Sequence, residues 1–218
     1  MAVYAGPEIV NTGLVLHLDA ANPRSYPGSG TVWTDLSGNG NNGTLVNGVG
    51  YNSANNGSMI FDGVNDYVQL TWGIMSGNAS YTYDAFFIKY NDTNSNWISY
   101  GTAANSSLNQ IGIFQGGIGV LNFGNDTTVP ASTVSSNTWH MISATHDGIT
   151  TRLYIDGVLV TSKNTSYTFG NSQLNICRAI TGSYYANINL SLVKIYNRAL
   201  SQQEVRQNFE ATRSRYGI

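Results

Sequence analysis

The stretch that decides the fold is MIFDGVNDYVQL, at Met59–Leu70. An apolar run, Met59–Phe61, ends in Asp62-Gly63. This dipeptide is typical of turns because Gly accepts a positive φ and Asp can bond its own backbone. The run Tyr67–Leu70 is rich in β-forming residues and predicts a second strand. The segment is therefore predicted to form two short strands around a polar turn.

The turn itself is a candidate metal site. Asp62, Asn65 and Asp66 place two carboxylates and an amide within five residues. Oxygen ligands at this density suit Ca²⁺. The alternative is that these side chains only make hydrogen bonds within the turn. The sequence leaves both interpretations open.

Further strands are predicted along the whole chain. Alternating apolar residues in Leu14–Asp19 indicate a strand with one buried face, and 22–43 is predicted to be loop. Turn dipeptides predict two hairpins, one through Gly116-Gly117 and one through Asp156-Gly157. The remaining predicted strands are Tyr81–Tyr90, Trp97–Tyr100, Gln110–Phe114, Ile118–Phe123, Arg152–Asp156, Val158–Ser162, Leu174–Cys177 and Ile188–Tyr196. The last is apolar on both faces, which favours a central position in a sheet.

The chain is predicted to end in one helix, from Gln202 to about Arg213. Ser201 and Glu204 have the spacing of a capping box, in which each side chain bonds the other residue's main-chain N–H. Val205 and Phe209 lie four residues apart, so they are expected to pack on the strands together.

Four motifs resemble those of laminin-G-like, concanavalin A-type sandwich domains, and they occur in that family's order. They are FDGVNDYV at Phe61–Val68, Trp139-His140 followed by Met141–Thr145, LYIDGV at Leu153–Val158, and VKIYNRALS at Val193–Ser201. The resemblance implies an all-β fold, an antiparallel jelly-roll β-sandwich with one short C-terminal helix. It implies a domain over 13–218 after an N-terminal arm at 1–12.

The resemblance also implies calcium as the candidate cofactor. Asp62 and Asp66 match the carboxylates of the family motif, and Asn65 could add an amide oxygen. The chain departs from the family in Ala186–Ser191, where relatives often have Gly and an acidic residue. This difference weakens the expectation of a metal site near that strand.

A narrower resemblance concerns the ends of the chain. Gly13–Ala21, Tyr26–Gly30, Trp33–Asn39 and Arg213–Ile218 are similar to laminin-G-like proteins encoded by tailed bacteriophages. This implies a virion protein, either a capsid decoration or a tail or fibre appendage, whose partners are other virion proteins. A place at a symmetry axis of the particle would make it a homo-oligomer, and we expect a trimer.

Composition sets limits on partners and compartment. The chain has 218 residues, a length that suits a single sandwich domain. Its net charge of −2 gives no support for a nucleic-acid partner. No apolar run is long enough to span a membrane, and Met1–Pro7 lacks the pattern of a signal peptide. The single cysteine, Cys177, lies in an apolar run and is predicted to be a buried thiol.

Basic residues outnumber acidic ones in the C-terminal segment. The residues concerned are Lys194, Arg198, Arg206, Arg213 and Arg215, against Glu204 and Glu210. A basic tail can dock on an acidic partner, and the alternative is solvated charge on a surface helix. We expect assembly contacts from this helix or from the arm, Met1–Asn11, which shows no core pattern.

The sequence predicts no enzyme. Glycoside hydrolases need two carboxylates close together, and hydrolases of this fold carry them on alternate residues of one strand. The three glutamates, Glu8, Glu204 and Glu210, lie in the arm and the terminal helix. His140, His146 and Asp147 are available for a Ser-His-Asp triad, but no Gly-X-Ser-X-Gly elbow is present.

Glycan binding would need aromatic platforms beside polar groups. Trp72 and Trp97, near polar loops, are the candidates, followed by Trp33 and Tyr26, and the alternative for each is core packing. The leading hypothesis is a non-enzymatic virion protein on the particle surface that binds host or environmental glycans. The alternative is an extracellular, calcium-dependent bacterial lectin.

Overall fold

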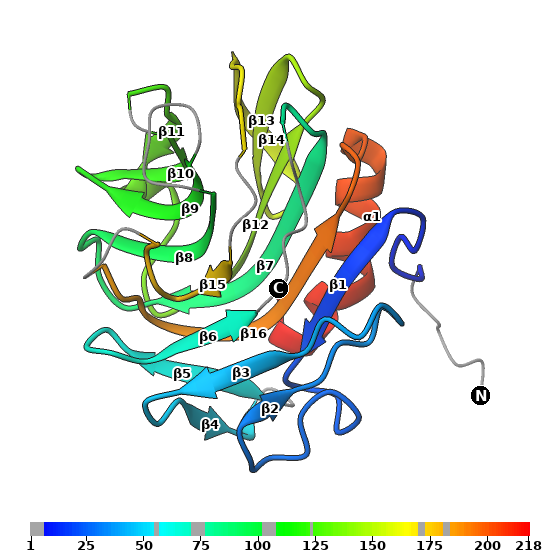
Figure 1. Cartoon of the computed structure of the whole chain (residues 1–218), viewed down its shortest axis with the longest axis vertical. Helices are drawn as coiled ribbons and strands as arrows, with labels where there is room; N and C mark the ends of the chain where they lie inside the picture. Colours follow the sequence, from blue (N-terminus) through cyan, green and yellow to red (C-terminus); the bar gives the residue numbers. More distant parts are fainter. Residues whose placement is uncertain are drawn as a thin grey trace.

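The computed structural model describes residues 7–54, 57–70, 77–101, 108–122, 124–169, 173–180 and 184–218. Within these ranges the chain forms two antiparallel sheets of eight strands each, which face one another (Figure 1). The fold is therefore the all-β sandwich with one short C-terminal helix that the sequence predicts.

The first sheet has the strand order β14-β13-β12-β7-β16-β5-β4, and β1 pairs with β16. Its strands are β1 Leu14–Asp19, β4 Gly50–Asn52, β5 Ser58–Asp62, β7 Tyr81–Lys89, β12 Trp139–His146, β13 Thr150–Ile155, β14 Val158–Asn164 and β16 Asn187–Tyr196. β16 pairs with β5, β7 and β1, which confirms the central position predicted for it.

The second sheet has the order β11-β10-β9-β8-β15-β6-β3-β2. Its strands are β2 Val32–Trp33, β3 Gly43–Val46, β6 Tyr67–Leu70, β8 Ser95–Gly101, β9 Leu108–Phe114, β10 Gly117–Leu121, β11 Thr127–Pro130 and β15 Leu174–Ile176. The two-residue strand β2 lies within 22–43, so the prediction of loop throughout that range is wrong at this point.

The turn at Asp62-Gly63 carries the chain from one sheet to the other. β5 belongs to the first sheet and β6 to the second, so the two predicted strands form but do not pair. Asp62 Oδ1 accepts the N–H of Val64 at 2.8 Å, which fixes the turn. Gly63 has φ 78°, and a Cβ there would lie 2.9 Å from the Cβ of Asn187. Only glycine fits this crossing without strain.

Both predicted hairpins form, but the first turns at Gln115-Gly116, one residue before the predicted Gly116-Gly117, and Gly117 is the first residue of β10. Gln115 and Gly116 have φ of 49° and 78°, and Asp156 and Gly157 have φ of 51° and 76°. Two successive positive φ angles are the geometry of the tight hairpin turns that match strand twist. β9 pairs with β10 and β13 with β14 across these turns.

Apolar side chains form two clusters. The larger fills the space between the sheets and includes Phe87, Trp97 and Cys177, which is buried as predicted. The smaller lies between the outer face of the first sheet and helix α1, Gln202–Thr212, and includes Phe86 and Val205. Figure 1 shows α1 on the side of the first sheet away from the second.

The capping box at the start of α1 is confirmed. Ser201 Oγ accepts the N–H of Glu204, and the Glu204 carboxylate accepts the N–H of Ser201 at 2.9 Å. The helix ends at Thr212, and a 3₁₀ turn, η3, continues over Arg213–Tyr216. A second 3₁₀ turn, η2, covers Ala131–Thr133.

The described part of the N-terminal arm is packed into the fold, which corrects the prediction that the arm has no core pattern. Val10 is only 7% exposed and belongs to the helix cluster. Its N–H donates to Asn208 Oδ1 at 2.8 Å, and its carbonyl accepts from Tyr196 Oη at 2.9 Å. Gln207 holds the carbonyl of Glu8 in the same way. Residues 8–12 therefore hold the helix against the first sheet.

Candidate functional site

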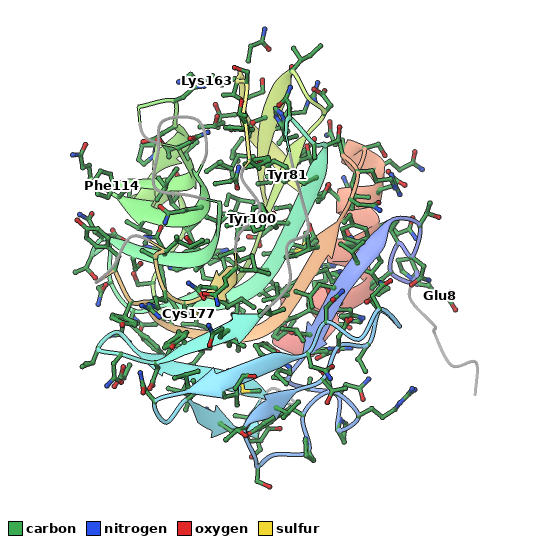
Figure 2. All side chains as sticks on the ribbon, in the orientation of Figure 1. Glu8, Tyr81, Tyr100, Phe114, Lys163 and Cys177 are labelled. Atoms are coloured by element: carbon green, nitrogen blue, oxygen red, sulfur yellow. The ribbon has the colours of Figure 1, made fainter. Side chains whose placement is uncertain are left out.

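A hollow of about 410 Å³ lies on the outer face of the second sheet. The described residues that line it come from β8, β9, β10 and three connections between strands, and they are Asn96, Gln110, Phe114, Gln115, Leu121, Gly124, Asp126 and Tyr184. We call it the outer-face pocket. Figure 2 shows Phe114 on the side of β9 away from the first sheet.

Strand alternation places the β9 residues of this pocket. Ile111 and Ile113 point into the core, so Gln110 and Phe114 point to the outer face. On β8 the register shifts between Asn96 and Ile98, which marks a β-bulge. Bulges re-aim side chains, and here Trp97 enters the core while Asn96 lines the pocket.

One wall of the pocket is apolar. The rings of Phe114 and Tyr184 meet edge to face, with centroids 6.2 Å apart and planes at 87°. Tyr184 is 43% exposed and comes from the segment between β15 and β16. Its carbonyl accepts the N–H of Ala179 at 3.1 Å, which fixes the main chain at Tyr184. With Leu121, these rings give an apolar wall open to solvent, made of the face of one ring and the edge of the other.

The rest of the pocket is polar. Asn96 is 5% exposed, and its Oδ1 is buried without a hydrogen-bond partner in the described part of the chain. Gln110 donates from Nε2 to Ser99 Oγ at 2.8 Å. Asp126 Oδ1 accepts the N–H of Asn122 at 2.6 Å. The pocket therefore combines amides and one carboxylate with aromatic surface.

The prediction that Trp97 binds a ligand is wrong. Trp97 is fully buried, its ring lies 4.3 Å from that of Phe87, and its Nε1 donates to Ser95 Oγ at 3.1 Å. A side chain without exposed surface cannot present a face to a sugar. Trp33 and Tyr26 are also buried, and Trp72 lies outside the described residues.

The predicted calcium ligands lie at the crossing turn. Asp62 and Asn65 are exposed, and Asp66 is buried. Burial and then the charge of Asp62 raise the pKa of the Asp66 carboxyl. Among the described residues, no group of three or more His, Cys, Asp or Glu side chains converges.

These residues supply calcium with only part of a ligand set. Ca²⁺ takes six to eight oxygens, and Asp62 Oδ1 is already occupied by the turn N–H groups of Val64 and Asn65. Asp62 therefore makes the turn hydrogen bonds that the alternative interpretation predicts. Calcium binding at this turn stays a prediction.

The histidines show one hydrogen-bonded series that the sequence did not predict. His140 Nδ1 lies 2.7 Å from Asp156 Oδ2, and His140 Nε2 lies 2.8 Å from Ser135 Oγ. Asp156 Oδ1 also accepts the N–H of Met141 at 2.7 Å. This is the Ser-His-Asp order of serine hydrolases, but none of the three residues lines the outer-face pocket. Its evident role is to tie the β13–β14 turn to the start of β12.

The other predicted candidates for a triad have different partners. His146 contacts Thr151 Oγ1 and Asn78 Oδ1, each at 3.1 Å, and burial lowers its pKa to about 4. Asp147 pairs with Arg152, whose hydrogen bond lowers the pKa of the carboxyl to about 2. His146 and Asp147 therefore do not combine with His140.

The predicted basic tail is largely neutralised inside the molecule. Arg198 pairs with Glu204 at 2.6 Å, and Arg215 pairs with Asp19 at 2.7 Å. Glu210 accepts Arg213 at 2.7 Å, and Lys194 is buried beside Asp84 at 3.7 Å. Because these charges have internal partners, the docking of this segment on an acidic surface loses its support.

The pocket residues were missed because they come from distant parts of the chain. Gln110 and Phe114 alternate with core isoleucines, so their outward direction could have been read from the strand pattern. Asn96 depends on a bulge, and Tyr184 on the path of a connection, and neither has a local sequence signal.

These features define a class: a lectin-like sandwich of two antiparallel sheets with a hollow on one outer face. The sequence model described as the concanavalin A-like lectin/glucanases superfamily matches residues 62–206. The chain belongs to this superfamily, which confirms the resemblance of its four motifs. No curated protein sequence matches the chain. Within the described ranges, no helix has the length and apolar character needed to cross a membrane.

Solved structures share the fold at low sequence identity. The binding domain of Paraclostridial Mosquitocidal Protein 1 has a TM-score of 0.67 and 20% identity, over 90% of this chain and 52% of that one. Domain 4 of an arabinanase from Geobacillus stearothermophilus, solved with arabinotriose, has a TM-score of 0.68 and 16% identity, over 90% of this chain and 98% of that domain. Trypanosoma rangeli sialidase with sialic acid has a TM-score of 0.69 and 16% identity, over 94% and 34%. This chain thus spans about half of the toxin domain and a third of the sialidase.

Proposed function

We propose that this protein is a non-enzymatic glycan-binding domain, and that the glycan binds in the outer-face pocket. The observation that carries the proposal is the lining of the pocket. The Phe114–Tyr184 pair offers apolar surface, and Asn96, Gln110 and Asp126 offer polar groups beside it. A pyranose ring has the same division, with C–H groups on its faces and hydroxyl groups on its edge.

The size of the pocket supports a small ligand. Its volume of about 410 Å³ falls within the range of roughly 300–1,000 Å³ that is usual for small-molecule sites. One structure of the same fold, an arabinanase domain, was solved with the neutral sugar arabinotriose. This ligand belongs to that protein, and it supports sugar as the class of ligand here.

The absence of catalysis is part of the proposal. Asp126 is the one carboxylate among the described lining residues, whereas glycoside hydrolysis uses two. Glu204 and Glu210 are paired with arginines on the helix side of the first sheet. The pocket therefore has groups for binding but lacks a second acid for bond cleavage.

The test is a glycan array with a matched control. The double variant Phe114→Ala, Tyr184→Ala removes the aromatic wall and should abolish the binding that the wild type shows. Tyr90→Ala is the control, because Tyr90 is 40% exposed, close to the 43% of Tyr184, and does not line the pocket. Equal binding by the double variant and the wild type would contradict the proposed site.

We also propose that the domain serves on the surface of a tailed-phage particle. The support is the sequence resemblance of Gly13–Ala21 and Arg213–Ile218 to phage-encoded proteins. Quantitative mass spectrometry of purified particles tests this. Hundreds of copies per particle indicate a capsid decoration, a few copies indicate a tail or fibre, and absence contradicts the proposal.

The alternative is a free calcium-dependent lectin, and the two carboxylates of the crossing turn, Asp62 and Asp66, are the observation that favours it. An array repeated with calcium and with chelator separates the two functions. The lectin is supported if the wild type loses glycan binding with chelator and the Asp66→Asn variant lacks binding even with calcium. Binding unchanged by chelator removes calcium from the function.

A further inference from the structure

We propose that the outer-face pocket selects neutral sugars and rejects acidic ones, an inference that rests on the proposed glycan binding. Two acceptors of the pocket, Asn96 Oδ1 and one oxygen of Asp126, have no donor among the described residues, and the one charged side chain of the described lining is the carboxylate of Asp126. A ligand must therefore bring hydrogen-bond donors and must not bring negative charge.

The first acceptor is Asn96 Oδ1. It is buried, and it has no donor among the described residues. Leaving a buried acceptor unpaired costs about 1–3 kcal/mol, so the site favours a ligand that donates a hydrogen bond to it. A sugar hydroxyl can donate, whereas a ligand carboxylate or sulfate has no proton to give.

The second acceptor is the carboxylate of Asp126. Its Oδ1 holds the N–H of Asn122, and Oδ2 has no donor in the described part of the chain. Hydrogen bonds to a carboxylate are the stronger ones, and adjacent sugar hydroxyls can supply them. An acidic sugar would instead place a second negative charge beside this one, which is unfavourable in a partly buried site.

The nearby positive charge of Lys163 contacts the main chain of Asp126 and not its carboxylate. Lys163 Nζ donates to the main-chain oxygen of Asp126 at 3.1 Å, from the exposed end of β14. Lys163 does not line the pocket, and Figure 2 shows it at one end of the sandwich, away from Phe114. The lining therefore offers an acidic sugar no basic partner among its described residues.

The Phe114–Tyr184 wall sets the orientation of the ring. The C–H face of a neutral pyranose can lie on this wall while its hydroxyl edge faces Asn96 and Asp126. Asn96 and Asp126 line the same pocket as the Phe114–Tyr184 wall, so one sugar ring can contact the wall and both polar side chains.

The experiment compares ligands that differ in one group: galactose with galacturonic acid, glucose with glucuronic acid, and lactose with sialyllactose, by calorimetric titration. We expect each neutral sugar to bind at least about tenfold more tightly, from the loss of one hydrogen bond to a charged group. Asp126→Asn should weaken neutral binding about tenfold or more and narrow the preference. Glu210→Gln, which makes the same change of net charge on α1, should alter neither.

A second variant separates a ligand role from a structural one. Asn96→Leu has nearly the same shape and removes the unpaired acceptor, so it should raise the unfolding temperature while lowering sugar affinity. A purely structural asparagine would lose stability when replaced.

The outcomes distinguish this inference from the function beneath it. Acidic sugars that bind as tightly as neutral ones, and lose binding with Phe114→Ala and Tyr184→Ala, overturn the selectivity and leave the site in place. Binding of neither kind by the wild type overturns the glycan function itself.

Discussion

The Asn208→Ala variant tests how the arm, helix and first sheet hold together. Asn208 is fully buried on α1 and joins three elements. Its Oδ1 accepts the N–H of Val10, and its Nδ2 donates to Asp84 Oδ2 at 2.7 Å and to Tyr196 Oη at 2.9 Å. Alanine removes these contacts and leaves buried polar groups of the arm and of β7 without their partner.

The magnitude follows from the three hydrogen bonds. Two are neutral and contribute about 1 kcal/mol each, and the bond to the Asp84 carboxylate contributes about 1.5–3 kcal/mol. The expected loss is about 3–5 kcal/mol of the free energy of unfolding, a large part of the roughly 5–15 kcal/mol of a typical protein. For a chain of this length the melting temperature should fall by roughly 10 °C.

Urea unfolding followed by tryptophan fluorescence measures this loss. The control is Gln207→Ala, because Gln207 also bonds the arm, at the carbonyl of Glu8, but is only partly buried and makes this bond in contact with solvent. The control should change the free energy of unfolding by less than about 1 kcal/mol. If Asn208→Ala is as stable as the control, the buried network does not hold the helix and the reasoning fails.

Four further predictions concern stability and reactivity. Burial lowers the pKa of His17 and of His146 to about 4, from 6.5 in the unfolded chain, so the unfolded state binds more protons between these values. The free energy of unfolding should therefore fall as pH drops from about 6.5 to 4, by up to about 3 kcal/mol for each histidine. Urea titrations across this pH range measure the fall. A free energy of unfolding that does not change with pH would contradict the buried, neutral state of the two histidines. Trp97→Ala should lower the free energy of unfolding by about 3–5 kcal/mol in the same assay, because the Trp97 ring fills the core. A loss below about 1 kcal/mol would instead support an exposed, ligand-binding Trp97. Cys177, whose pKa is raised by burial, should react with a thiol reagent only after unfolding, and rapid labelling of the folded protein would show that the core is open. Deleting residues 1–11 should lower the melting temperature, because Val10 is lost from the apolar cluster under α1. An unchanged melting temperature would show that the arm does not stabilise the domain.

Signals carried by a few neighbouring residues were sufficient to predict most of the fold. The capping box at Ser201 and the turn at Asp156-Gly157 depend on local backbone geometry, and each forms as predicted, whereas the other hairpin turn lies one residue before the predicted Gly116-Gly117. The strand Ile188–Tyr196 was placed centrally because both of its faces are apolar, and three strands pair with it.

The site could not be predicted in the same way, because it is made by pairing between distant strands. Trp97 looked like a platform beside a polar loop, but the bulge at Asn96 turns it into the core. Phe114 and Tyr184 are far apart in sequence and meet only when the second sheet forms. The arm was misjudged for a similar reason, since Val10 finds its partners on α1 and β16.

The most direct test is a crystal structure of the protein with the glycan that binds most tightly on the array. The account predicts a neutral sugar ring against Phe114 and Tyr184, with hydroxyl groups donating to Asp126 and Asn96. A sugar bound at the crossing turn, beside Asp62 and Asp66, or elsewhere outside the outer-face pocket, would contradict it.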